Sequence, residues 1–314
     1  MNLPLYPLKF DPIYQERVWG GRNLESVFGR KLPTEGKPIG ESWEICDRPE
    51  ANNLVVNGHL AGKTLHEVIQ LDQKAIMGDT PLINGQFPLL IKLLDAQERL
   101  SLQVHPPAEM AEVLKGEPKT EMWYVAQATT DAHLIAGLQK NATRASFEAS
   151  LKDNSCENQC YRFPVTEGDV MFLPSGRLHA IDAGNVIVEI QQNSDTTYRV
   201  YDWGRPRELH IEKSLDSINF NDFEPKLSAR LRPTDDFVET VKCDYFTTIK
   251  RYASKSFTVE KEPRFFEIWI ALDGDATLNG ETFSKGDSIL IPADLTRLEV
   301  NLTGSSLSWL MVMP

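Results

Sequence analysis

A seven-residue pattern that occurs twice restricts the fold of this chain more than any other feature. Residues 168–174 read GDVMFLP, and residues 286–292 read GDSILIP. Each copy combines a Gly-Asp turn, a short apolar strand and a proline, which ends the strand because it cannot donate to the hydrogen-bond ladder. Evenly spaced short strands are also expected at about 160–165, 186–191 and 198–203, and throughout 245–313. The chain is therefore predicted to be mainly β, with two related β-barrels and a few short helices.

Helices are expected only between the strands. Thr64 and Glu67 have the spacing of a capping box, which predicts a helix over residues 64–77. Residues 87–94 instead form a nearly continuous apolar run, which is typical of a strand buried on both faces. Two further helices are predicted over 108–115 and 142–152.

Composition excludes several classes of partner. The 314 residues carry a formal net charge of −12, which argues against nucleic acid or an anionic membrane as the main partner. No run approaches the roughly 18 apolar residues that a membrane-spanning helix needs, and the N-terminal segment lacks the pattern of a signal peptide. A soluble, cytoplasmic protein is therefore expected, with reduced thiols at all four cysteines: Cys46, Cys156, Cys160 and Cys243.

Polar side chains occupy one face of a predicted strand over residues 100–105. Leu100, Leu102 and Val104 alternate with Ser101, Gln103 and His105, and two prolines follow. Because side chains of a strand alternate between its faces, the hydroxyl, the amide and the imidazole point the same way. A row of three short polar groups predicts a ligand-binding surface.

The first copy of the repeat continues to His179 in the pattern G-x5-P-x-G-x2-H, which resembles the second signature of cupin barrels. A strand over 119–125 adds Glu121. The sequence thus predicts four metal ligands, Gln103, His105, Glu121 and His179, whose imidazole, carboxylate and amide groups suit Zn, Fe, Mn or Ni. The second copy of the repeat lacks this histidine, so its barrel is expected to bind no metal.

Four segments together resemble type I mannose-6-phosphate isomerases, most closely the short bacterial form: residues 100–106, 119–124, His179 and 189–203. The resemblance implies one Zn²⁺ per chain, held by the four predicted ligands. It also implies substrate-pocket roles for Ser101 and Lys119, a pocket role for Glu189 and a catalytic role for Arg199. The implied reaction interconverts mannose 6-phosphate and fructose 6-phosphate through an enediolate. Residues 1–235 would form the catalytic cupin domain, and 236–314 a degenerate barrel without metal.

The residues themselves agree with these implied roles. Lys119 lies two positions before Glu121 and therefore shares its face of the strand. Arg199 lies on an otherwise aromatic strand, where a buried guanidinium needs an anion such as a sugar phosphate. Two other interpretations stay open: an ion pair of Arg199 with Asp195 or Asp202, and a solvent-facing Lys119. The proton-transferring base is also open between Glu189 and a Lys119 of depressed pKa.

Two other functions are compatible with the same residues. An iron-dependent cupin dioxygenase could use the same ligands, and a non-catalytic sugar-binding protein with two cupin barrels could keep them in one barrel. Within the isomerases, specificity for glucose 6-phosphate or a broader range of sugars remains open. The sequence does not decide between a monomer and a homodimer.

Overall fold

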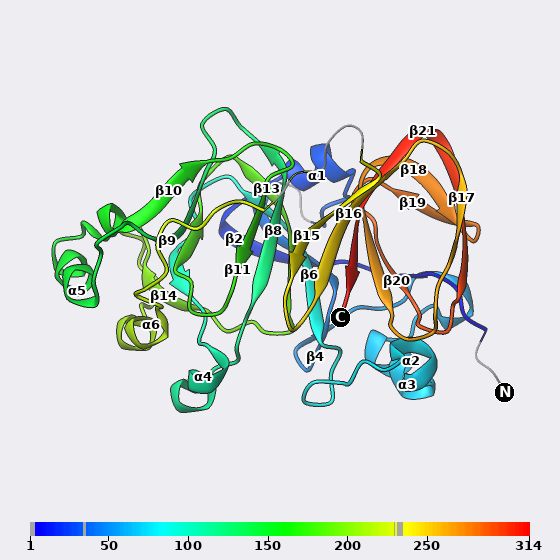
Figure 1. Ribbon diagram of the computed structural model, residues 1–314, viewed down its shortest axis with the longest axis horizontal. Coiled ribbons are helices and arrows are strands. Elements are labelled where there is room, and N and C mark those ends of the chain that lie inside the picture. Colours follow the sequence, from blue (N-terminus) through cyan, green and yellow to red (C-terminus); the bar gives the residue numbers. More distant parts are fainter. Residues whose placement is uncertain (1–3, 34–35, 229, 231–234) are drawn as a thin grey trace.

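Three large β-sheets carry most of the computed structural model, which describes residues 4–33, 36–228, 230 and 235–314. Two of the sheets form the first half of the molecule, on the left of Figure 1, and the third forms the C-terminal half on the right. The mainly β architecture with a few short helices is as predicted. The halves have a jelly-roll character, although their sheets do not close into complete barrels.

The first half consists of a six-stranded and a five-stranded sheet. The six-stranded sheet has the order β11 (Val170–Leu173), β8 (Glu121–Ala128), β13 (Asn185–Gln192), β6 (Leu89–Ala96), β3 (Ile39–Ile45) and β2 (Ile13–Gly21). The five-stranded sheet has the order β10 (Cys160–Pro164), β9 (His133–Leu138), β12 (His179–Ile181), β7 (Leu102–Val104) and β14 (Tyr198–Tyr201).

The C-terminal half is one eight-stranded sheet. Its order is β1 (Leu8–Lys9), β20 (Ser288–Ile291), β18 (Glu267–Leu278), β21 (Arg297–Met313), β16 (Thr247–Ala253) and β15 (Phe237–Lys242), with β17 (Phe257–Glu260) paired to β21 and β19 (Glu281–Ser284) paired to β18. The long strands β18 and β21 pair with two register shifts, which bend them around an apolar core. A separate two-stranded ladder joins β4 (Asp47–Arg48) to β5 (Ala51–Asn52).

The central strands of the six-stranded sheet are buried on both faces. On β6, Ile91 and Leu93 join a core that extends to the C-terminal sheet, whereas Lys92 and Leu94 face a cavity on the opposite side. On β13, Val188 likewise packs into the shared core. This arrangement explains the continuous apolar run over 87–94, because a strand with apolar packing on both faces needs no alternation.

Helices are short and lie at the margins of the sheets (Figure 1). The predicted capping box of Thr64 and Glu67 is present, but the expected single helix is two, because the Asp72 side chain caps a second helix by accepting from the Ala75 amide at 3.0 Å. None of the helices in the described ranges is long and apolar enough to cross a membrane. The helices are α1 (Asn23–Phe28), α2 (Leu65–Leu71), α3 (Gln73–Met77), α4 (Ala108–Leu114), α5 (Arg144–Lys152) and α6 (Ile211–Ser217), with 3-10 turns η1 (Gly58–Leu60) and η2 (Cys156–Gln159).

The two halves are joined by more than the chain connection. Strand β1, near the N-terminus, pairs with β20 of the C-terminal sheet, and one apolar core contains residues of both halves. The predicted connection over about 204–240 contains α6, and its residues 229 and 231–234 lie outside the described part of the chain. The division at residue 235 stays a prediction. All four cysteines are free thiols, as expected.

The stability of the C-terminal half is expected to depend on Trp309, a residue of its apolar core. Its indole is buried and stacks on Trp269 and Phe257, with ring centroids 5.0 and 5.7 Å apart. Replacing Trp309 by alanine is expected to lower the free energy of unfolding by roughly 3–5 kcal/mol, since it removes a large buried side chain. Denaturant-induced unfolding measures this loss, and a value below about 1 kcal/mol would mean that the core refills the cavity.

Candidate active site

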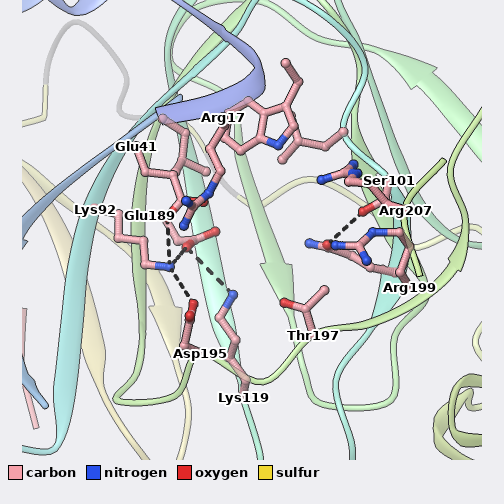
Figure 2. Close-up of a pocket in the computed structure, with 14 residues that line it drawn as sticks. Arg17, Glu41, Lys92, Ser101, Lys119, Glu189, Asp195, Thr197, Arg199 and Arg207 are labelled. Carbon is pink, nitrogen blue, oxygen red and sulfur yellow. Dashed lines mark hydrogen bonds and ion pairs between the residues drawn. The ribbon is translucent and has the colours of Figure 1, made fainter. Parts of the chain in front are cut away.

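A polar cavity of about 320 Å³ lies in the first half of the molecule. Its lining comes from both sheets, because β6 and β13 of one sheet and β7 and β14 of the other direct polar side chains into it. Figure 2 shows the charged residues that surround this space. The lining residues are Arg17, Trp19, Glu41, Lys92, Leu94, Leu100, Ser101, Gln103, Lys119, Glu189, Asp195, Thr197, Arg199 and Arg207.

Three of the predicted metal ligands lie together beside the cavity. His105, Glu121 and His179 are buried, and their ligand atoms all lie within 4.8 Å of one another. Glu121 begins β8 and His179 begins β12, whereas His105 directly follows β7. Residues that are distant in the chain therefore converge where the two sheets of the first half face each other.

Both imidazoles are oriented by backbone carbonyl groups. Nδ1 of His105 donates to the Thr196 carbonyl at 2.7 Å, and Nδ1 of His179 donates to the Arg177 carbonyl at 2.8 Å. Each Nε2 is then left with a lone pair and lies near Glu121, at 3.7 Å from His105 and 3.5 Å from His179. Burial lowers the pKa of both histidines, that of His179 to about 3, which keeps the rings in the neutral form that binds metals.

The Glu121 carboxylate has the environment of a metal ligand. Both of its oxygens are buried and accept no well-aligned hydrogen bond from the part of the chain that the structure describes, and the Lys119 ammonium lies 2.6 Å from Oε2. Burial alone would raise the pKa of Glu121, but Lys119 and the two histidines hold it well below its usual range. Two neutral imidazoles and one buried carboxylate are a donor set that a divalent transition metal fits.

Gln103, the fourth predicted ligand, lies next to this group. Its amide nitrogen is 3.3 Å from His179 Nε2, and its oxygen is 3.4 Å from the Ser101 hydroxyl. Ligation through the amide oxygen requires the opposite orientation of the amide, since oxygen is the ligand atom of that group. Ser101 and Gln103 both line the cavity, as the alternation of the strand predicts.

A cluster of charges surrounds Lys119 and Glu189. Lys119 is buried rather than solvent-facing, and its ammonium lies 3.8 Å from Glu189 Oε1. Burial alone would lower the pKa of Lys119, but Glu121 and Glu189 raise it above its usual value. Burial and the Glu121 charge raise the pKa of Glu189, which accepts a hydrogen bond from Trp123 Nε1 at 2.8 Å. The pKa of Lys119 is thus raised, the opposite of the depressed pKa that a basic Lys119 would need.

Lys92 is a cavity residue that the sequence analysis missed. Figure 2 places it among three carboxylates, 3.5 Å from Glu41, 3.7 Å from Asp195 and 3.9 Å from Glu189. Glu41 also accepts from Arg17 Nε at 2.8 Å. The sequence did contain a signal for this residue. A lysine inside the apolar run over 87–94 indicates a buried ion pair, because lysine is almost never fully buried unless it is paired.

In Figure 2, the side of the cavity opposite Lys92 and Glu189 carries Arg199, Arg207, Ser101 and Thr197. Nη1 of Arg199 donates to the Glu208 carbonyl at 2.8 Å, and none of the described residues accepts a hydrogen bond from its buried Nε. Within the described ranges Arg199 forms no ion pair with Asp195 or Asp202, so the structural alternative for this residue is not realised. Arg207, which also faces the cavity, was not predicted.

The C-terminal half contains a counterpart of the Glu121 strand. Glu121 and Trp123 of β8 pair with Leu173 and Met171 of the first repeat, and Glu267 and Trp269 of β18 pair in the same register with Ile291 and Ile289 of the second. The repeat therefore includes a second Glu-x-Trp strand. This similarity is not apparent in the sequence, because the segments between the Glu-x-Trp strand and the repeated turn differ in length. Trp269 Nε1 donates to Glu267 at 2.7 Å, and the described residues place no histidine in this core.

The jelly-roll sheets and the buried His-Glu-His group define a cupin-type protein with a candidate metal site. Residues 7–120 match the family described as phosphomannose isomerase type I, catalytic domain. The mannose-6-phosphate isomerase ManA of Bacillus subtilis is 34% identical over 92% of this chain and 94% of its own. The mannose-6-phosphate isomerase of Streptococcus mutans is 33% identical over 91% and 92%.

The chain is also similar in structure to solved proteins described as mannose-6-phosphate isomerases. The mannose 6-phosphate isomerase structure from Bacillus subtilis superposes with a TM-score of 0.86, at 30% identity, over 98% of this chain and 99% of that one. A structure described as a putative mannosephosphate isomerase from Archaeoglobus fulgidus, at 21% identity, shares the fold with a TM-score of 0.78 over 99% and 98%. The chain belongs to the mannose-6-phosphate isomerase family.

Proposed function

We propose that this protein is a zinc-dependent aldose-ketose isomerase that interconverts mannose 6-phosphate and fructose 6-phosphate through an enediolate. The observation that carries the proposal is the position of the buried His105, Glu121 and His179 group beside a cavity rich in basic side chains. Membership of the family supports the same substrate, since the relatives from Bacillus subtilis and Streptococcus mutans are named mannose-6-phosphate isomerases.

The charge of the cavity suits a phosphorylated sugar. Five basic and three acidic side chains line it, in a protein whose net charge is −12. A phosphate monoester carries about −1.5 to −2 charges near pH 7, which this local excess of positive charge attracts. We assign the phosphate to Arg199 and Arg207, because planar guanidinium groups match phosphate oxygens. Ser101 and Lys119 would hold the sugar.

His105, Glu121, His179 and Gln103 would hold the zinc ion. When bound, the ion supplies Lewis-acid polarisation of the sugar carbonyl. The carbonyl groups of Thr196 and Arg177 orient the two imidazoles for this role. Lys119 adds a fixed positive charge near the oxygen that becomes negative in the enediolate.

Glu189 would move the proton between C1 and C2. Trp123 fixes one carboxylate oxygen, and the other lies toward Lys92 and Lys119 inside the cavity. Replacing Glu189 by glutamine preserves size and removes the base, so kcat is expected to fall by about 10²–10⁴-fold with the metal content unchanged. Steady-state kinetics together with metal analysis measure both quantities.

Glu44 offers a matched control for this substitution. It is a buried glutamate on β3, paired with Arg30, and it does not line the cavity. The Glu44→Gln variant is therefore expected to keep its kcat, even where its stability changes. If Glu189→Gln retained more than about a tenth of the wild-type kcat, Glu189 would not be the base.

Product formation tests the proposed function directly. Purified protein is expected to form fructose 6-phosphate from mannose 6-phosphate, to lose this activity on chelation and to regain it with Zn²⁺. Glucose 6-phosphate serves as the C2 epimer that tests specificity. Oxygen uptake with Fe²⁺ in the absence of isomerisation would favour the dioxygenase, and sugar binding without turnover would favour the non-catalytic protein.

A further inference from the structure

Asp202, which directly follows β14, is a buried carboxylate that binds two arginines. Its oxygens accept from Nε and Nη2 of Arg207 at 2.6 and 2.7 Å, a bidentate pair. Oδ1 also accepts from Arg205 Nη2 at 2.8 Å. The two guanidinium groups have different positions, because Arg207 lines the cavity and Arg205 does not. One negative charge therefore holds two positive charges, only one of which reaches the cavity.

Arg207, the cavity-lining member of this cluster, has one hydrogen-bond donor to spare within the described ranges. Among the described residues, none accepts a hydrogen bond from Nη1 of Arg207. Burial lowers the pKa of Arg199, and the nearby positive charge of Arg207 lowers it further. Figure 2 shows Arg199 and Arg207 in the same part of the cavity. Two like charges repel each other there, so a mobile Arg207 side chain would turn away unless another group held it.

We propose that Asp202 is a positioning residue, which holds Arg207 in the cavity and thereby sets the affinity of the site for a phosphate group. The inference rests on the proposed function, because it concerns the phosphate end of the same substrate. The bidentate pair fixes the plane of the Arg207 guanidinium and leaves Nη1 available for a phosphate oxygen.

A second anchor keeps Asp202 itself in place. Arg205 Nη2 donates to the Arg99 carbonyl at 2.7 Å, in the segment between β6 and β7. Arg205 thus links the Asp202 carboxylate to the backbone of the segment between β6 and β7. The segment after β14 therefore presents Arg207 from a fixed position. Burial alone would raise the pKa of Asp202, but Arg207 and Arg205 keep it below its usual value, so the carboxylate stays charged.

The test compares Asp202→Asn with a matched control, Asp169→Asn. Asp169 is also buried and also forms an ion pair with an arginine, Arg230, and neither of these two residues lines the cavity. We expect Asp202→Asn to raise the KM for mannose 6-phosphate about ten-fold and to weaken binding of inorganic phosphate similarly, with kcat within about two-fold, on the scale of one charge-assisted hydrogen bond. Asp169→Asn is expected to change stability but neither the KM nor the affinity for inorganic phosphate.

Adding Arg207→Ala distinguishes positioning from a general structural role. In that background Asp202→Asn is expected to change KM no further, because the residue it positions is already absent. A rise in KM that persists in the Arg207→Ala background, or an unchanged KM in the single variant, overturns the proposal. If Asp202→Asn does not fold, Asp202→Glu retains the charge and moves it by one methylene, and the same two comparisons apply.

Failure of the proposed function has a separate signature. If the wild-type protein forms no fructose 6-phosphate, the isomerase proposal fails, whereas calorimetric binding of inorganic phosphate still compares wild type with Asp202→Asn. A loss of phosphate affinity in the variant then supports the positioning role, and equal affinity overturns it.

Discussion

Replacing Glu121 by glutamine is expected to remove the metal and lower kcat about a thousand-fold, which corresponds to roughly 4 kcal/mol of lost transition-state stabilisation. The substitution keeps the shape of the side chain but removes the only carboxylate of the buried His-Glu-His group. A neutral amide is a weaker ligand for a divalent ion than a carboxylate. Metal analysis of the purified variant and steady-state kinetics measure the two effects.

Glu267→Gln is the matched control for Glu121→Gln. Glu267 has the same register in β18 as Glu121 has in β8, and it is also buried. Its partner is Trp269, and an amide oxygen can still accept the indole hydrogen bond. This variant is therefore expected to keep its metal and its activity. If both variants lost activity equally, or if Glu121→Gln kept its metal, the assignment of Glu121 as a ligand would be wrong.

Replacing Arg199 by alanine is expected to lower kcat/KM by about 10²–10³-fold while the metal content stays at the wild-type level, since the substitution removes a charged group from the side of the cavity that we assign to the phosphate. Within the described residues Arg199 forms no ion pair and no hydrogen bond with the His-Glu-His group. Kinetics with mannose 6-phosphate and metal analysis on the same preparation give both values.

Arg144→Ala provides the comparison for the loss of an arginine. Arg144 is exposed at the start of α5, where it pairs with Glu148 and Asp216. Its removal is expected to leave kcat/KM unchanged. If metal content and activity fell together in Arg199→Ala, Arg199 would have a structural role instead of binding the phosphate.

Much of the candidate site could be predicted from local sequence. The alternation over residues 100–105 places Ser101 and Gln103 on one face of a strand, and both line the cavity. The spacing of Lys119 and Glu121 likewise places their charged groups together, 2.6 Å apart. These predictions depend on the period of a strand, which is a local property of the backbone.

Other residues could not be assigned to the site without the tertiary structure. Lys92 and Leu93 are neighbours in one apolar run, yet Lys92 faces the cavity and Leu93 faces the core shared with the C-terminal sheet. Arg207 also lines the cavity, and its bidentate contact with Asp202 joins two residues whose side-chain positions the strand pattern does not predict. The pairing of Glu267 with the second repeat could not be recognised from the sequence either, because the segments between the matching strands differ in length.

The sequence by itself determined the strands, their alternation, the repeated turn and the residue types suited to a metal and a phosphate, because each follows from interactions between residues close together in the chain. Only the tertiary structure decided which face of a doubly buried strand meets the cavity, and which charges end up as neighbours. Those outcomes depend on the packing of three sheets against one another, and on contacts between residues as far apart as Lys92 and Asp195.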